Sequence, residues 1–415
     1  MLNKPEFLED LKRLIAINSI NGSCGEKTDS APLGKGINDA IEAFLEIGKR
    51  FGFRTKNVGG CCGWIEMGEG DKMLGIITHT DTVETGDGWS YPALECTVTE
   101  DGIYGRGVID NKGPALLALY CMKAIQDSGI DLGKRVRLII GGDEEAGSWK
   151  CMKAYKETEE IPSIAFSPDA EYPVVFGEKG LLRVTISGDE ENIAPDFKAE
   201  GGKVINIVPD EAHATLDGKK LSAKGKSAHG SMPEKGENAI LKLADEIISK
   251  YPFSTFAKLL SLTTAKALNI DISDTDTKTS VNPSVLVADN KNCSLSYDIR
   301  YPISADGEAV IANIKRAAEE KGLKAEIFLH DKPLYVPRDS HLVKTLSAIY
   351  TEHTGDSSEP VAIGGGTYAK AFPNCVAFGV MLPGEPETMH APDEFWGFES
   401  IDINYDIISD AIVKL

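Results

Sequence analysis

The run Met73-Leu74-Gly75-Ile76-Ile77-Thr78 is a short apolar segment that ends in His79-Thr80-Asp81. Two more runs of this kind lie at residues 136–140 and 163–166, and a helical pattern begins near Pro114 between the first two runs. Further helical patterns precede the first run, at residues 7–15 and 37–51. Strands separated by helices predict an α/β fold, in which helices flank a parallel or mixed sheet on both faces.

The pattern of apolar and polar residues changes after about Gly177. Half-exposed strands and helices alternate there in an α+β pattern. The expected strands are 181–187, 204–208, 212–216, 220–224, 285–288, 293–300 and 324–329, and the expected helices are 238–251, 256–268 and 307–321. A chain of 415 residues is expected to form two domains. We therefore expect an α/β domain at 1–177 plus 333–415, interrupted by an inserted α+β domain at 178–332.

Composition and charge exclude several classes of protein. The formal net charge is −20 and no basic stripe is visible, so the chain does not look like a nucleic-acid binder. We see no signal peptide and no apolar run of membrane-spanning length. The eight cysteines show no CxxC pairing or regular framework, and reduced cytosolic thiols are the simplest explanation. We expect a cytoplasmic protein without nucleic-acid or membrane partners, and Cys61 and Cys62 receive no role.

Residues that commonly bind metals stand where four predicted strands end, namely the three runs above and the segment 104–109, which ends in Asp110. Ligands of open α/β sheets bind beyond the carboxyl ends of the strands. Each residue alone is more often structural, as a turn residue or a helix start. Five positions that should converge change this interpretation, and carboxylates mixed with imidazole suit zinc, cobalt or manganese. The candidates are His79, Asp110, the Asp143-Glu144-Glu145 run, Asp169 and His390.

Two local arguments refine the predicted site. Residues i and i+2 of an extended chain point the same way, so Asp81 can accept a hydrogen bond from the second ring nitrogen of His79. Glu144 and Glu145 are neighbours, so their side chains diverge. One of them can bind metal while the other reaches a metal-bound water, and these residues alone leave open which does which.

Taken together, the motifs resemble those of the co-catalytic zinc metallopeptidases. That family includes carboxypeptidase G, succinyl-diaminopimelate desuccinylase, aminoacylase and carnosinase. The motifs are Thr78-His79-Thr80-Asp81, Gly105-Arg106-Gly107-Val108-Ile109-Asp110-Asn111-Lys112-Gly113-Pro114, Asp143-Glu144-Glu145 and Ser167-Pro168-Asp169-Ala170. Segments 167–173, 176–180, 206–209, 227–231, 364–369 and 389–392 are most similar to the bacterial PepV-type dipeptidases.

The resemblance implies a role for each candidate residue. Two zinc ions, or manganese or cobalt in their place, would be bridged by Asp110. His79 and Asp169 would complete one site, and Glu145 and His390 the other. Glu144 would be the general base, beside Asp81. The family also implies a cis peptide at Asp110-Asn111.

The resemblance makes 1–177 plus 333–415 the catalytic dinuclear-metal domain and 178–332 a lid domain, and it implies substrate contacts, several of them in this lid domain. His229 would help to hold the substrate and polarise its carbonyl, and Arg300 would bind the substrate carboxylate. Asn206 and the glycines of the loop Gly364-Gly365-Gly366 would add polar contacts. The expected activity is hydrolysis of dipeptides with a free C-terminal carboxylate.

Three questions stay open at this point. The same metals could serve an aminoacylase or desuccinylase acting on N-acyl amino acids, and a metal-free binding scaffold is the alternative from another class. The inserted segment is short for the PepV-type branch, particularly between Asn206 and His229. In branches with a shorter lid, the lid dimerises and lends its histidine to the partner. The sequence thus leaves open a monomer or a homodimer through the lid domain.

Overall fold

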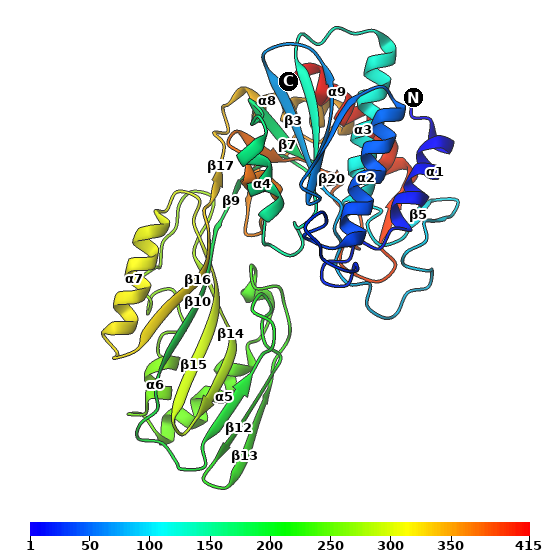
Figure 1. Cartoon of the computed structure of the whole chain (residues 1–415). Helices are drawn as coiled ribbons and strands as arrows, with labels where there is room; N and C mark the ends of the chain where they lie inside the picture. Colours follow the sequence, from blue (N-terminus) through cyan, green and yellow to red (C-terminus); the bar gives the residue numbers. More distant parts are fainter. The chain divides into compact units, whose positions relative to one another are not determined.

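The computed structural model describes residues 1–415, which form two compact units. The first unit contains Met1–Phe176, Val336–Val361 and Thr367–Leu415, and the second contains Gly177–Tyr335 and Ala362–Gly366. Figure 1 shows the elements of each unit. The glycine loop Gly364–Gly366 therefore groups with the second unit, whereas the sequence-based division had placed it in the catalytic domain.

A mixed sheet forms the centre of the first unit, which confirms the predicted α/β class. Strand β3 pairs in parallel with β6 and with β7, and β7 pairs in parallel with β19. The order is β1 (Arg54–Val58), β2 (Cys62–Gly68), β6 (Arg135–Gly141), β3 (Met73–His79), β7 (Ile164–Ser167), β19 (Cys375–Ala377) and β9 (Val175–Glu178). β2 pairs antiparallel with β1 and β6 at one edge.

Helices cover this central sheet. Every residue of β3 is buried, as expected for a strand with both faces covered. Apolar residues at helical spacing bury one face of the first helix, including Phe7, Leu11 and Leu14. The helices are α1 (Lys4–Ile15), α2 (Lys35–Arg50), α3 (Lys112–Ser128), α4 (Lys150–Thr158), α8 (His341–Thr354), α9 (Phe398–Lys414) and the short η2 (Tyr368–Ala371). None of the chain's helices has the length and apolarity needed to cross a membrane.

Two small sheets lie outside the central sheet and matter for the site. β5 (Gly102–Tyr104) pairs antiparallel with β4 (Thr97–Val98) and with β21 (Phe395–Gly397). β8 (Ala170–Glu171) pairs in parallel with β20 (Val380–Met381). The pairing of β5 with β21 brings the segment before Asp110 next to the segment after His390.

The second unit is an antiparallel sheet with helices packed on it. Its strand order is β13 (Lys219–Lys224), β12 (Glu211–Leu216), β11 (Lys198–Gly201), β14 (Ser280–Asp289), β15 (Asn292–Tyr301), β10 (Gly180–Asp189) and β16 (Lys324–Asp331). α5 (Ala239–Lys250), α6 (Thr255–Leu260) and α7 (Gly307–Glu319) contact these strands. The remaining short helix is η1 (Pro233–Lys235). Two short strands complete the order of the mixed sheet given above: β17 (Leu334–Tyr335) follows β9, and β18 (Val361–Ile363) also pairs with β9.

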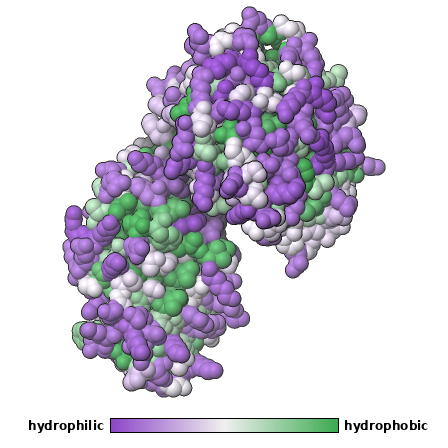
Figure 2. All heavy atoms as spheres, in the orientation of Figure 1, coloured by the Kyte–Doolittle hydropathy of each residue, from purple (hydrophilic) through white to green (hydrophobic).

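One face of this second sheet is open to solvent. Buried and half-buried residues alternate along β10, from Leu182 to Ile186 on the covered face and from Leu181 to Thr185 on the other. Apolar side chains also stay exposed, among them Val287 and Phe328. Figure 2 shows hydrophobic side chains gathered on the visible face of this unit.

Three expected elements differ from the structure. Residues 204–208 form turns and an isolated bridge between Ile207 and His229, instead of a strand. The helix expected at 256–268 ends at Leu260, just before the β-branched Thr263 and Thr264, which favour a helix less. The extended run before Asp110 ends at Tyr104, because the next residues turn with φ of 153° at Gly105 and 93° at Gly107.

Candidate active site

Three parallel strands carry candidate residues to one edge of the central sheet. His79 is the last residue of β3, Glu144 and Glu145 follow β6, and Asp169 follows β7. Since β3 is parallel to β6 and β7, their carboxyl ends meet at the same edge. This is the arrangement that the residue pattern predicted for these three strands.

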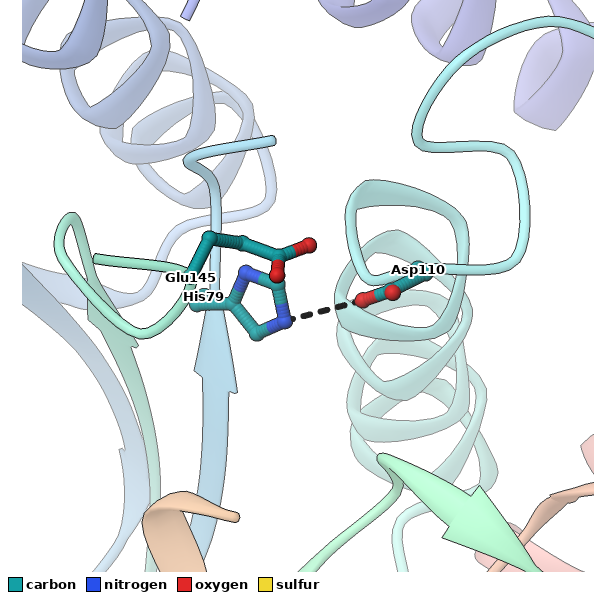
Figure 3. Close-up of side chains that lie close together, drawn as sticks. All are labelled: His79, Asp110 and Glu145. Carbon is teal, nitrogen blue, oxygen red and sulfur yellow. Dashed lines mark ion pairs between the residues drawn. The ribbon is translucent and has the colours of Figure 1, made fainter. Parts of the chain in front are cut away.

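The other two candidates reach this edge from loops. Asp110 lies in the loop before α3, so the expectation that it ends a sheet strand is wrong. His390 lies between β20 and β21, in the left-handed region at φ 62°. Figure 3 shows the side chains of His79, Asp110 and Glu145 pointing toward one another. One ligand atom from each of these three residues lies within 4.8 Å of the other two.

Asp110 lies between two imidazole rings. Its Oδ1 is 3.0 Å from Nε2 of His79, and its Oδ2 is 2.9 Å from Nε2 of His390. Nε2 of His79 is also 3.5 Å from Oδ1 of Asp169, and Nε2 of His390 is 3.2 Å from Oε1 of Glu145. The two oxygens of one carboxylate therefore face two separate groups of nitrogen and oxygen atoms.

The environment of His79 fits a bound cation. Its Nδ1 is 3.0 Å from the backbone carbonyl oxygen of Asp81, a contact that requires the ring proton on Nδ1. The Nε2 lone pair then faces the carboxylates of Asp110 and Asp169, and this buried atom has no hydrogen-bond partner. A divalent cation among these atoms would satisfy all of them, and mixed imidazole and carboxylate donors suit zinc, manganese or cobalt.

The pKa values show the same crowding of negative charge. Burial lowers the pKa of His79, but the carboxylates of Asp169 and Asp110 outweigh this and raise it well above its usual value. Hydrogen bonds to Asp110 and Glu145 raise the pKa of His390 to about 11. Burial, together with the charge of Asp110, raises the pKa of Glu145 to about 7. Divalent cations bound here would take the place of protons on these groups, because imidazole and carboxylate ligands bind metal in their deprotonated forms.

Asp81 plays a different part from the one its spacing suggested. Its carboxylate oxygens accept hydrogen bonds from the backbone N–H groups of Glu144 and Glu145, both at 3.1 Å. The nearer oxygen is 3.5 Å from Nδ1 of His79, farther than the backbone carbonyl. The i and i+2 argument needs an extended chain, and β3 ends at His79. Asp81 therefore fastens the glutamate pair to the end of β3.

Two residues near the ligands had not been singled out as site residues. The Asn111 side chain donates to Oδ1 of Asp169 at 3.1 Å and accepts from the backbone N–H of His79 at 3.3 Å. The peptide bond that links it to Asp110 is cis, as predicted. The Tyr368 ring stands edge-on to His79, with ring centres 6.1 Å apart, and its hydroxyl donates to Asp143. Their positions inside the quoted motifs were the only signal in the sequence.

The remaining candidates belong to the second unit. Arg300 is buried and donates to both oxygens of Asp298 and to the carbonyl of Gly364, at 3.1 Å. Nδ1 of His229 lies 2.6 Å from the hydroxyl of Ser231, on an exposed loop. The backbone carbonyl of Asn206 accepts from Gly230 at 2.6 Å. The structure thus brings Arg300 to the glycine loop, and Asn206 to the loop of His229.

Comparisons with known sequences agree with one another. A family model described as "Peptidase family M20/M25/M40" matches residues 75–414. "Putative dipeptidase YtjP" of Bacillus subtilis is 31% identical over an alignment that covers 99% of this chain and 97% of that protein. "Putative dipeptidase SH1171" of Staphylococcus haemolyticus is 33% identical, with 94% and 92% covered. The first alignment runs over 458 positions, so that relative has segments which this chain of 415 residues lacks.

Solved structures show the same fold at low sequence identity. Aminoacylhistidine dipeptidase from Vibrio alginolyticus superposes with a TM-score of 0.66 at 14% identity, and 99% of this chain and 97% of that chain are covered. The M20 family metallo-carboxypeptidase Sso-CP2 from Sulfolobus solfataricus gives 0.64 at 18% identity, with 99% of both chains covered.

Proposed function

The chain belongs to peptidase family M20/M25/M40 and is a hydrolase acting on peptide bonds, and on this premise we propose that it is a metal-dependent dipeptidase. The names of its relatives support the dipeptide as substrate. The observation that carries the metal dependence is Asp110, whose two oxygens each face a different imidazole.

We propose that two divalent cations bind here, zinc in the first place and manganese or cobalt as alternatives. His79 and Asp169 would hold one, His390 and Glu145 the other, and Asp110 both. When bound, such cations would polarise the scissile carbonyl and lower the pKa of the attacking water. The short contacts of Asp110 to both histidines support this division of ligands.

We assign the general base to Glu144. Its neighbour Glu145 is engaged with His390, and the two backbone N–H groups are both held by Asp81. With Glu145 engaged as a ligand, Glu144 would be the member of the pair that accepts a proton from the attacking water. It would then deliver that proton to the leaving amine.

We propose that the second unit binds the substrate. Three nitrogens of Arg300 donate to Asp298 and to the Gly364 carbonyl. The guanidinium has further N–H groups, which could bind a substrate carboxylate. His229 would donate to the carbonyl oxygen as charge develops on it, and Asn206 with the glycine loop would add polar contacts.

The proposal extends to location and assembly. All eight cysteines are free thiols, which supports a cytoplasmic protein because such thiols persist in a reducing compartment. A monomer and a homodimer through the second unit remain the two candidate assemblies. Mixing two inactive variants, His229→Ala and Glu144→Gln, separates them. Recovered activity would mean that His229 acts across a dimer, and its absence between exchanging subunits would mean that one chain is self-sufficient.

A substrate panel tests the proposed activity. Metal-free protein would be reloaded with zinc, manganese or cobalt and assayed on dipeptides, on N-acetyl amino acids and on N-succinyl amino acids. We expect dipeptides to be cleaved fastest and the metal-free protein to be inactive. Faster cleavage of N-acyl amino acids would replace the proposal with an aminoacylase or desuccinylase. Full activity without metal would overturn the metal dependence.

A further inference from the structure

A buried ion pair that the proposed chemistry does not use contacts the backbone of Asp110. Nη1 of Arg106 is 2.7 Å from Oε2 of Glu394, and neither side chain is more than 1% exposed to solvent. Removing two charges from water is costly, so a pair this deeply buried has to be satisfied by its surroundings. What surrounds it is the polypeptide that carries the candidate metal ligands.

Glu394 holds the loop that leads into Asp110. Its Oε1 accepts backbone hydrogen bonds from Gly107 at 3.0 Å, Ile109 at 3.0 Å and Asp110 at 3.2 Å. Gly107 has φ of 93°, a left-handed conformation that glycine adopts readily, which lets successive N–H groups of this loop point at one carboxylate. The Asp110 backbone is thereby fixed by a group four residues beyond His390 in the sequence.

Arg106 extends this contact to a third segment. Its Nη2 donates to the carbonyl of Glu84 at 3.3 Å, and its guanidinium lies over the Trp89 ring at 5.2 Å. Glu84 belongs to the segment that follows His79 and Asp81. The ion pair therefore touches all three segments that carry His79, Asp110 and His390.

We propose that Glu394 and Arg106 are positioning residues, which hold Asp110 and His390 in register so that one carboxylate can serve two cations. This inference rests on the proposed metal-dependent function. Neither residue touches the ligand atoms; Glu394 acts through the backbone of Asp110 and through its own loop. Loss of such supporting contacts typically weakens metal binding by about 10–100-fold.

The same unit offers a matched control. Glu66 on β2 is also buried and forms an ion pair with buried Arg137, at 2.7 Å, away from the candidate ligands. It also contacts Arg54 at 3.1 Å and Arg135 at 3.6 Å. Replacing either glutamate by glutamine removes one buried negative charge that is paired with arginine. A merely structural role predicts the same outcome at both positions, namely a lower Tm of the metal-free protein and unchanged metal affinity.

The experiment is calorimetric titration of metal-free wild type, Glu394→Gln and Glu66→Gln with zinc and with manganese, alongside thermal unfolding. We expect Glu394→Gln to bind metal about 10–100-fold more weakly, and Glu66→Gln to differ from wild type by less than about threefold. Equal affinity of Glu394→Gln and wild type would overturn the inference. A wild type that binds no metal would instead overturn the proposed function.

A second variant covers the case in which Glu394→Gln does not fold. Arg106→Lys keeps a positive charge beside Glu394 and loses the planar guanidinium that reaches Glu84 and Trp89. We expect it to weaken metal binding in the same direction. Wild-type affinity in folded Arg106→Lys would then count against the inference.

Discussion

The strands β3 and β10 differ in a way that separates the two units. β3 is buried along its whole length, whereas β10 alternates between buried and half-buried residues. A strand covered on both faces has little freedom at its end, so His79 is placed by the packing of a complete core. The sheet that contains β10 has one open face, and His229 of the same unit is also exposed to solvent. Rigid ligand placement and adaptable substrate contact thus call for different sheets.

Exposure follows the same division. The side chains of His79 and Asp110 are 1% and 8% exposed, while His229 is an exposed residue in a loop. His390, with a side chain 56% exposed, is the exception among the candidate ligands. It comes from a loop, and its loop is held by the contacts of Glu394. The comparison suggests that effects on metal affinity should be confined to changes in the first unit.

The sharpest test of this division is the base. Glu144→Gln should keep its metals and lower kcat by about 10²–10⁴-fold, because the glutamine cannot accept the proton from water. Metal content and kcat would be measured together, with Glu145→Gln as the matched variant that should lose metal. If Glu144→Gln loses metal and Glu145→Gln keeps it, the two roles are reversed.

A change in the second unit should affect the reaction and leave the metals alone. His229→Ala removes a donor to the developing oxyanion, which should cost on the order of 3 kcal/mol, or about a hundredfold or more in kcat. Metal stoichiometry and Tm should match those of wild type. An unchanged kcat would remove His229 from the mechanism, and loss of metal would make it a ligand.

Substrate length sharpens the comparison further. Because Arg300 would grip a carboxylate at one distance from the metals, free dipeptides should be cleaved roughly 10–100-fold faster than amidated dipeptides or tetrapeptides, the cost of about one charge-assisted contact. The measurement is kcat/KM on each pair of peptides. Equal values for free and amidated dipeptides would argue against Arg300 as the carboxylate group.

Core truncation gives the smallest expected effect on the site. Leu295→Ala in the core of the second unit and Ile76→Ala on β3 both remove buried groups and should cost about 2–5 kcal/mol of stability. Only Ile76→Ala, three residues before His79, should also weaken metal binding. Thermal unfolding and metal titration of both variants check this. Weakened metal binding in Leu295→Ala would show that the two units are energetically coupled.

Prediction from the sequence succeeded where a short run is rich in apolar, β-branched residues. The runs at 73–78 and 136–140 appear as β3 and β6, because runs of this length and composition fit a buried strand better than a helix. It failed at 204–208 and beyond Leu260, where short alternating or apolar stretches fit more than one structure. The prediction of a strand that ends at Asp110 failed for a local reason. Gly105 and Gly107 turn the backbone in a stretch whose sequence resembles a strand.

For the candidate site, the sequence by itself determined which residue types stand at strand ends and in what order, and the family to which these motifs belong. Only the tertiary structure decided how they are held. The ring proton of His79 is set by a backbone carbonyl, and the loop of Asp110 by Glu394, which lies 284 residues away along the chain. The spacing of residues reports periodic local structure. It carries no record of which backbone group a folded loop will turn toward a distant carboxylate, because that choice depends on packing of the whole unit.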